Sequence, residues 1–395
     1  MVIPNHHYAD LKGSYLFRGI SERIQQYLRQ NPDAHLLRLG IGDVSLPLCP
    51  AVIEAMHKAV EEQAHAETFQ GYLSECGMDP LRGTIAEYYR SRGIAIDADE
   101  VFVSSGASDE LGDILHLFDR STVSLIMEPA YPAYTDANIM DGRPVQYLSA
   151  SSENGFLPLP DESVHAGLIY LCSPNNPTGA VYSYDKLKLW IDYAKRNQAV
   201  ILFDAAYEAF VQDPSLPRSI FEVPGAETFA IEICSLSKTA GFTGTRLGYT
   251  VLPKTLCADG MNFHDMWIRN RTTRTNGVSC IIQKAGLAVF SPEGQKQIQD
   301  NLEVYRKNAE CLMRALDEAG IWYCGGKNSP YIWMKCPSGC TSWEFFDRLL
   351  NEIQVIGTPG SGFGPCGEGY FRLSAFGDAG EIAEASSRLK QFLLR

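Results

Sequence analysis

Short apolar runs alternate with helical stretches from residue 37 to about residue 280, and this alternation strongly constrains the fold. Typical runs are VSLIMEP at 123–129 and AVILFDAAY at 199–207. Between them lie stretches with helical periodicity, such as YDKLKLWIDYAKRN at 184–197. Strand, loop and helix repeated in this order predict βα crossovers and a mostly parallel sheet. The predicted fold class is therefore α/β.

The pattern changes near residue 290, which indicates a second structural unit. Residues 291–320 have the pattern of one long helix, with Ser291 as N-terminal cap, Pro292 in the first turn and Gly320 as the stop. A chain of 395 residues also exceeds the size at which a single core usually stops growing. We expect an N-terminal arm and helix that join the small domain (1–45), a large domain (46–285) and a smaller α+β C-terminal domain (286–395).

Charge and cysteine content argue against several classes of protein. The formal net charge is −13 and no basic run occurs, which argues against a nucleic-acid-binding surface. Neither a long apolar run nor a secretory signal pattern is present, so no membrane span or leader is expected. The eleven cysteines are scattered, and Cys336 and Cys340 have no second pair to complete a zinc site. We expect reduced thiols, no metal, a cytoplasmic location, and small molecules or a second copy of the chain as partners.

Lys238 follows the apolar run FAIEICSLS, at the end of a predicted strand. Ligands of open α/β sheets collect at the carboxyl ends of strands. A lone lysine in such a place is most often a solvated surface charge. Here Ser235, Ser237 and Arg246 lie close by in the sequence, and two hydroxyls with a guanidinium can hold a phosphate group. The amine could then react with an aldehyde on the same ligand.

Two other predicted strand ends carry groups that suit a pyridine ring. Asp204 follows the run VILF, and a buried carboxylate needs a partner such as a protonated ring nitrogen. Tyr207 and Asn176 could both hydrogen-bond a phenolic oxygen on that ring. Taken alone, the NNPTG segment around Asn176 is equally typical of a simple turn.

A further anion site is predicted where VFVSSGASDEL passes from strand to helix. The backbone amides of Ala107 and Ser108 would lie at the N-terminus of that helix. The Gly-Ala-Ser segment is weak evidence by itself. It is also not a GxGxxG fingerprint, which argues against a nicotinamide dehydrogenase.

Three segments in this order and spacing, SPNNPTG, FDAAY and SLSKTAGFTGTRLG, resemble pyridoxal-phosphate enzymes of fold type I, specifically aminotransferases of classes I and II. Further segments, including LRLGIGD, GGKNSPYIW and TPGSGFGPCGEGYFRLSAFG, resemble the LL-diaminopimelate aminotransferases over nearly the whole chain. The resemblance implies a fold type I transferase that uses pyridoxal 5′-phosphate and forms a homodimer with shared active sites. It also implies interconversion of LL-diaminopimelate and 2-oxoglutarate with tetrahydrodipicolinate and glutamate, in lysine and cell-wall precursor synthesis.

The resemblance also assigns roles to residues of this chain. Lys238 would form the covalent bond to the cofactor and then move the proton between the substrate α-carbon and the cofactor. Tyr72 would reach the phosphate from the partner subunit, and Tyr131 would stack on the ring. The implied cofactor-binding residues are Tyr72, Ala107, Ser108, Tyr131, Asn176, Asp204, Tyr207, Ser235, Ser237 and Arg246.

Arg372, in YFRLSAF, matches the arginine that grips the substrate α-carboxylate, for which a bidentate guanidinium is suited. Without the resemblance, this arginine would be interpreted as a charge that faces out from a strand. Asn276 matches a residue supplied by the other subunit. The implied substrate-binding residues are Tyr15, Gly42, Tyr131, Asn176, Asn276 and Arg372.

Two positions depart from the pattern of the family. An acidic residue is usual where this chain has Gln70, and a lysine is usual where it has Ser108. Because neutral hydrogen bonds discriminate less than desolvated ion pairs, we expect a relaxed preference among amino donors. An aspartate or aromatic aminotransferase, or a β-lyase on the same fold, is the alternative activity. A ligand-sensing regulator would need a DNA-binding module, for which no basic surface is evident.

Overall fold

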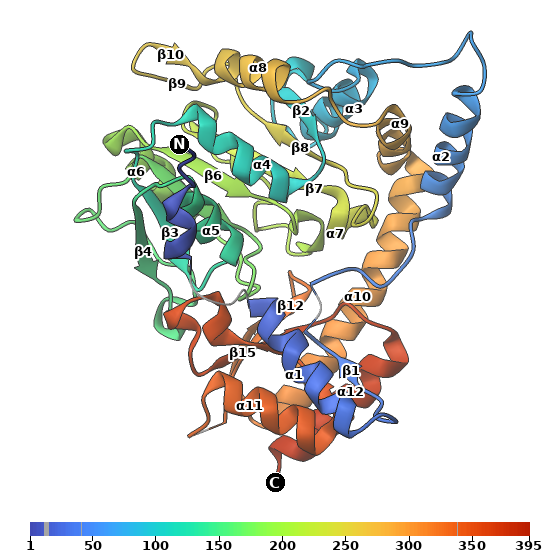
Figure 1. The fold of residues 1–395 in the computed structure, drawn as a ribbon, viewed down its shortest axis with the longest axis vertical. Helices are drawn as coiled ribbons and strands as arrows, with labels where there is room; N and C mark the ends of the chain where they lie inside the picture. Colours follow the sequence, from blue (N-terminus) through green and yellow to red (C-terminus); the bar gives the residue numbers. More distant parts are fainter. Residues whose placement is uncertain (12–15, 41, 338) are drawn as a thin grey trace.

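The computed structural model describes residues 1–11, 16–40, 42–337 and 339–395. Its large part is built on a seven-stranded sheet with the order β2-β8-β7-β6-β5-β3-β4 (Figure 1). All neighbours pair in parallel except β8, which runs antiparallel to both β2 and β7. The strands are β2 (Val101–Ser104), β3 (Ser124–Glu128), β4 (Val145–Ser149), β5 (Leu168–Cys172), β6 (Val200–Asp204), β7 (Ala230–Ser235) and β8 (Gly248–Val251). The predicted α/β class with a mostly parallel sheet is confirmed.

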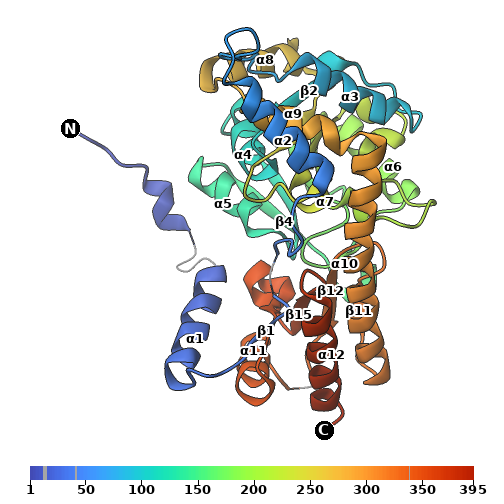
Figure 2. The same cartoon turned by 90° about the vertical axis from the view of Figure 1, so that its right-hand side faces the viewer.

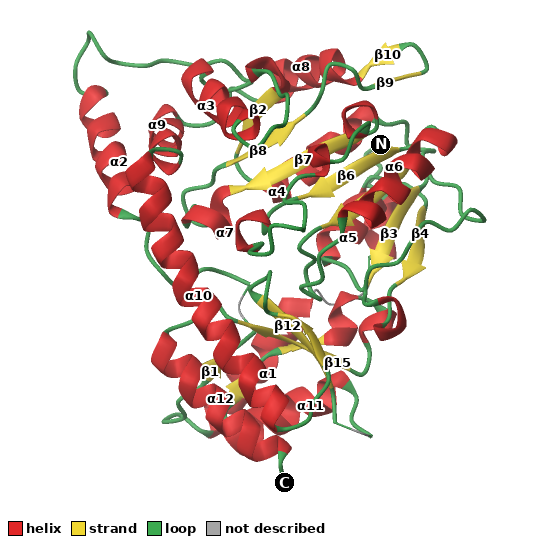
Figure 3. Ribbon diagram, turned by 180° about the vertical axis from the view of Figure 1, so that it is seen from behind, coloured by secondary structure: helices red, strands yellow, loops and turns green. Residues whose placement is uncertain are grey.

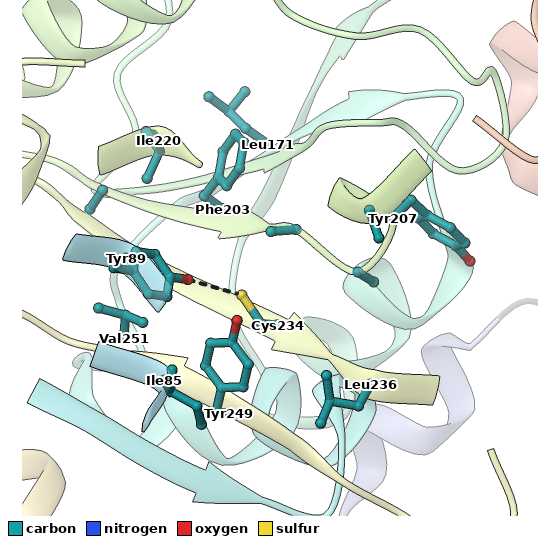
Figure 4. Packing of buried hydrophobic residues seen from close by; sticks show 14 of the residues in the cluster. Ile85, Tyr89, Leu171, Phe203, Tyr207, Ile220, Cys234, Leu236, Tyr249 and Val251 are labelled. Atoms are coloured by element: carbon teal, nitrogen blue, oxygen red, sulfur yellow. Dashed lines mark hydrogen bonds between the residues drawn. The ribbon is translucent and has the colours of Figure 1, made fainter. Parts of the chain in front are cut away.

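Helices cover both faces of this sheet, so its central strands are buried and largely apolar. Every residue of β6 is buried. Ile201 and Phe203 belong to the core on one face, whereas Val200 and Leu202 belong to the core on the other, as alternation along a strand requires. Figure 4 shows Phe203 packed with Leu171 and other members of the first core. The helices are α2 (Pro50–Glu62), α3 (Asp79–Arg90), α4 (Ala107–Asp113), α5 (Pro132–Met140), α6 (Tyr184–Asn197), α7 (Leu236–Ala240), α8 (Phe263–Arg274) and α9 (Cys280–Val289).

A four-stranded antiparallel sheet forms the centre of the smaller part, with the order β11-β12-β15-β14. Its core also includes Ile20, Ile24 and Leu37 from the N-terminal region. Helix α1 lies beside α11 in both Figure 1 and Figure 2. We propose on this packing that α1 and β1 join the small domain. The arm before them lies against the large part instead, because the turn His6–Asp10 packs on α5 and Asn5 Nδ2 donates to the Met140 carbonyl at 2.7 Å. The elements are α1 (Leu16–Gln30), β1 (Leu37–Arg38), β11 (Tyr323–Gly325), β12 (Tyr331–Lys335), α11 (Ser342–Arg348), β13 (Val355–Ile356), β14 (Thr358–Pro359), β15 (Tyr370–Ser374) and α12 (Ala379–Leu393).

The long helix α10 (Pro292–Glu318) connects the two parts (Figure 3). It packs on α2 and α9 near its start and on α12 and β12 further along. The side chain of Ser291 accepts a hydrogen bond from the Gly294 amide, as the cap prediction requires. Gly320 takes a left-handed φ of +69° just beyond the helix, which confirms the predicted stop.

Among the residues that the structure describes, no helix is both long and apolar enough to cross a membrane. The same residues contain no cluster of three or more histidine, cysteine or acidic side chains that could hold a metal ion. All eleven cysteines are unpaired.

Candidate active site

A cavity of about 390 Å³ opens where the carboxyl ends of the large-sheet strands face the small sheet. Asp204 and Ser235 reach it from the ends of β6 and β7, and Arg372 reaches it from β15. Most of the predicted site residues line this one cavity. They are Gly42, Ala107, Ser108, Tyr131, Asn176, Asp204, Tyr207, Ser235, Ser237, Lys238, Arg246 and Arg372.

Three predicted site residues are not among those that line the cavity. Tyr72 is 89% exposed, and Asn276 is also exposed. Tyr15 lies outside the described residues. The segment between α2 and α3, which carries Tyr72, projects from the edge of the molecule (Figure 1).

The cavity also contains residues that sequence reasoning missed, among them Asp43, Tyr134 and Tyr331. Tyr134 had a signal, because it lies three residues after the predicted Tyr131, in the first turn of a segment that Pro132 could open as a helix. Asp43 directly follows Gly42 at the end of the LRLGIGD segment, which the family resemblance had already singled out. Tyr331 belongs to the small sheet, and no local pattern relates it to the distant strand ends.

Lys238 is presented by the short helix α7, which starts where β7 ends. The hydroxyl of Ser235 caps this helix by accepting a hydrogen bond from the Ser237 amide at 3.2 Å. The Lys238 Nζ lies 3.6 Å from Asp43 Oδ1. Burial lowers the pKa of Lys238, and the carboxylate of Asp43 opposes this effect. A lysine of this kind has a larger neutral, nucleophilic fraction than an exposed one.

Arg246 lies at the end of the cavity next to α4. Its Nη1 donates hydrogen bonds to Ser237 Oγ at 3.4 Å and to the Thr243 carbonyl at 3.0 Å. Gly106, just before α4, has a φ of +116°, and a Cβ on it would lie 2.5 Å from Arg246 Nη2. The absence of a side chain at Gly106 therefore makes room for the guanidinium. Arg246, the serine hydroxyls and the first amides of α4 together form a site suited to a phosphate group.

Asp204 is a buried carboxylate at the end of β6. Its Oδ2 accepts a hydrogen bond from the Tyr134 hydroxyl at 2.5 Å, and its Oδ1 accepts one from the Ala206 amide at 3.0 Å. Burial raises the pKa of Asp204, against the lowering effect of these two hydrogen bonds. In the part of the chain that the structure describes, no cationic side chain pairs with it, so it is suited to pair with a cation on a ligand.

Arg372 is buried in the small sheet, with 1% of its surface exposed. Its Nη1 donates to Asn176 Oδ1 at 2.7 Å, and its Nη2 donates to the Gly40 carbonyl at 3.0 Å. Its guanidinium lies over the ring of Tyr331, 4.3 Å from the ring centroid. The buried Nε has no hydrogen-bond partner among the described residues. A buried guanidinium with an unused donor is suited to bind a carboxylate.

Comparisons with known proteins agree with this geometry. The model of the family "Aminotransferase class I and II" matches residues 34–389. An LL-diaminopimelate aminotransferase of Lawsonia intracellularis is 47% identical over 411 residues, and the alignment covers 100% of both chains. One of Lachnospira eligens is 48% identical over 400 residues, with 98% of each chain covered.

Among solved structures, the L,L-diaminopimelate aminotransferase from Chlamydomonas reinhardtii superposes with a TM-score of 0.93 at 38% identity. It covers 99% of this chain and 98% of its own. The match therefore extends over both sheets and the cavity between them. On the fold, the cavity and these relatives, the chain belongs to the class I and II aminotransferases.

Proposed function

We propose that this aminotransferase interconverts LL-diaminopimelate and 2-oxoglutarate with tetrahydrodipicolinate and glutamate, with pyridoxal 5′-phosphate as cofactor. The observation that carries the proposal is the cavity, which contains a partly buried lysine, a buried carboxylate and two separate guanidinium groups. The choice of substrate rests on the relatives, which carry the name LL-diaminopimelate aminotransferase at 47% and 48% identity over 98% or more of the chain.

The residues present fit a phosphorylated pyridine aldehyde. Arg246, Ser235 and Ser237 would hold the phosphate, and Lys238 would bind the aldehyde carbon. The lack of a cationic partner for the buried Asp204 carboxylate supports its pairing with the ring nitrogen. The remaining proposed cofactor contacts are Ala107 and Ser108 at the phosphate, Tyr131 at the ring face, and Asn176 and Tyr207 at the phenolic oxygen.

When bound, the cofactor supplies a ring that stabilises negative charge at the substrate α-carbon. The rest of the chemistry belongs to the chain. The Arg372 guanidinium binds and orients the substrate α-carboxylate, and Asn176 keeps that guanidinium in place. The neutral Lys238 Nζ would remove the α-proton of the amino donor and deliver it to the former aldehyde carbon of the cofactor. With the oxo acid as substrate it would move a proton in the opposite direction.

We also propose that the active enzyme is a homodimer in which each subunit completes the other's site. Tyr72 and Asn276 lie outside the cavity and are exposed. Exposed residues of this kind are free to enter the active site of a partner subunit. We infer a cytoplasmic location from the eleven unpaired cysteines, because such thiols are typical of reducing compartments.

The visible spectrum of the purified protein tests this proposal. The wild-type protein loaded with pyridoxal 5′-phosphate should absorb in the visible range, lose that band with LL-diaminopimelate and regain it with 2-oxoglutarate. Lys238→Ala should lack this cycle because it has no amine to bind the cofactor or move the proton. A spectrum that responds to aspartate or aromatic amino acids but not to LL-diaminopimelate would favour the alternative aminotransferases.

The neutral residues Gln70 and Ser108 lead to a second proposal about selectivity. Ser108 lines the cavity and Gln70 is exposed on the segment that carries Tyr72. Neither can form an ion pair with the distal ammonium or carboxylate of diaminopimelate, so other donors should be tolerated. Values of kcat/KM for LL-diaminopimelate and for a panel of other amino acids measure the selectivity among amino donors. A preference of several orders of magnitude for diaminopimelate would contradict it.

A further inference from the structure

Arg271 and Glu110 form a buried ion pair outside the cavity. Arg271 lies in the last turn of α8 and is 5% exposed, and Glu110 lies in the first turn of α4 and is 1% exposed. Arg271 Nη1 donates to Glu110 Oε1 at 2.6 Å, and Thr250 Oγ1 donates to Glu110 Oε2 at 2.7 Å. Neither member of the pair lines the cavity.

The remaining donors of Arg271 hold two further segments of the chain. Its Nη2 donates to the Val103 carbonyl of β2 at 2.7 Å. Both Nε and Nη2 donate to the Glu75 carbonyl, at 3.3 and 3.2 Å. The neighbouring Thr272 hydroxyl also donates to Glu75 Oε1 at 2.5 Å. One guanidinium therefore joins the start of α4, strand β2 and the segment just after Tyr72.

These segments carry two kinds of proposed active-site residue: those that a subunit uses in its own site and those that it supplies to its partner. Ala107 and Ser108 open α4 and lie in the same first turn as Glu110. Tyr72 lies three residues before Glu75, and Asn276 lies five residues after Arg271. The two partner-directed segments also touch, because a Cβ on Gly277 would lie 2.9 Å from the Ser74 carbonyl. Arg271 thus stands between the subunit's own phosphate site and the segments offered to its partner.

A buried ion pair is weak evidence for stability, because desolvation opposes the attraction between the charges. Its directional hydrogen bonds fix geometry instead, and a planar guanidinium holds several acceptors at once where an ammonium cannot. We propose that Arg271 is a positioning residue that sets the start of α4 through Glu110 and sets the Tyr72 segment through the Glu75 carbonyl. This inference rests on the proposed cofactor and dimer.

Two variants separate the two effects. Glu110→Gln weakens the link to α4 and leaves the donors to Val103 and Glu75 in place, so it should weaken cofactor binding to the apoenzyme without changing KM at saturating cofactor. Arg271→Lys should affect both quantities. Loss of one charged hydrogen bond predicts a change of about tenfold in each affected constant. Burial raises the pKa of Glu110 to about 7, against the opposing effect of Arg271, so measurements are made above that pH.

Arg274→Lys is the matched control. Arg274 also joins α8 to α4, by pairing with Asp113 at 3.3 Å, but its side chain is 46% exposed. An exposed pair of this kind contributes little, so neither constant should change. Equal effects of Arg271→Lys and Arg274→Lys would overturn the proposal.

Mixed dimers locate the effect on the partner. When a subunit carrying both Lys238→Ala and Arg271→Lys is paired with a wild-type subunit, the one functional lysine receives its Tyr72 and Asn276 from the variant. KM should rise at that site. Cofactor affinity there should fall as well, because the displaced Tyr72 is a proposed phosphate contact. When a Lys238→Ala subunit is paired with an Arg271→Lys subunit, cofactor affinity should fall while KM stays normal. Identical behaviour of the two mixed dimers would overturn the proposal.

Amide hydrogen exchange of the apoenzyme gives a readout that needs neither cofactor nor turnover. Arg271→Lys should speed exchange both in residues 72–78 and at the start of α4, and Glu110→Gln only at the start of α4. This pattern in a protein that fails to bind pyridoxal 5′-phosphate would reject the proposed function and keep the positioning role. Unchanged exchange in both segments would reject the positioning role.

Discussion

Two opposing influences act on the amine of Lys238. Burial lowers its pKa, with smaller contributions from Arg246 and Arg372 in the same direction, and the Asp43 carboxylate at 3.6 Å raises it. Attack on an aldehyde needs the neutral amine, which is present above the pKa. Asp43 therefore controls the pH at which the apoenzyme captures its cofactor.

Replacing Asp43 with asparagine should shift cofactor capture to lower pH. Loss of the carboxylate lowers the pKa of Lys238 further, so the neutral amine exists at lower pH than in the wild type. The rate of the absorbance change after mixing apoenzyme with pyridoxal 5′-phosphate, measured across pH, gives the midpoint. Asp10→Asn, an exposed change in the N-terminal arm, is the control. A midpoint that stays in place or rises would contradict this role.

Gly106→Ala should weaken cofactor binding. The new Cβ would lie 2.5 Å from Arg246 Nη2, and the φ of +116° is strained for alanine. Strain of about 1–3 kcal/mol predicts a rise in the cofactor Kd of about fivefold to 150-fold. Gly112→Ala is the matched control, because it lies in the adjacent helix α4 with nothing within 4 Å of its Cβ. Unchanged affinity in Gly106→Ala would show that Arg246 can move without loss.

At the scale of elements, the sequence predicted those features that depend on local pattern. The strands expected at VFVS, VSLIMEP, AVILFDAAY and FAIEICSLS formed as β2, β3, β6 and β7, and the helix expected at 184–197 is α6. Strands β4 and β8 were missed. β4 is an edge strand with largely exposed residues, so its apolar signal is weak. β8 has four residues and runs antiparallel, and strand direction depends on distant pairing. Tyr331 was missed as a cavity residue for the same reason.

Gly294→Ala in α10 should destabilise the protein, although alanine normally favours a helix. Its Cβ would lie 1.8 Å from the Ala288 carbonyl oxygen, and backbone cannot move aside as a flexible side chain can. Gly83→Ala in α3, with nothing within 4 Å, should instead stabilise the protein by about 0.5–1 kcal/mol. Chemical denaturation measures the free energy of unfolding, which should fall in Gly294→Ala and rise in Gly83→Ala. A gain of stability in Gly294→Ala would contradict the close packing at this turn.

At the scale of the whole molecule, the cavity alone does not contain every residue that the proposed reaction uses. The exposed Tyr72 and Asn276 need a second subunit to take part. A shared site of this kind makes complementation between two defective chains a direct test. These two residues could be predicted only from the family resemblance, because within one chain they lie outside the cavity.

Lys238→Ala and Tyr72→Ala should each have low activity alone and regain activity when their subunits are mixed. In a mixed dimer one site receives an intact Lys238 from one chain and an intact Tyr72 from the other. Because half of randomly re-formed dimers are mixed and each has one complete site, about a quarter of wild-type activity should return. Size-exclusion chromatography checks that the chains associate. No recovery from well-mixed dimers would show that Tyr72 does not act across the interface.

The packing of α1 with the C-terminal part has a consequence for synthesis on the ribosome. Ile20 and Ile24 share a core with Val355, Ile382 and Leu389, which leave the ribosome after the whole large sheet. The seven-stranded sheet lies between these two groups in the sequence and can assemble first. Helix α1 is therefore made well before its core partners, and its apolar face stays open to chaperones and to aggregation until they have emerged.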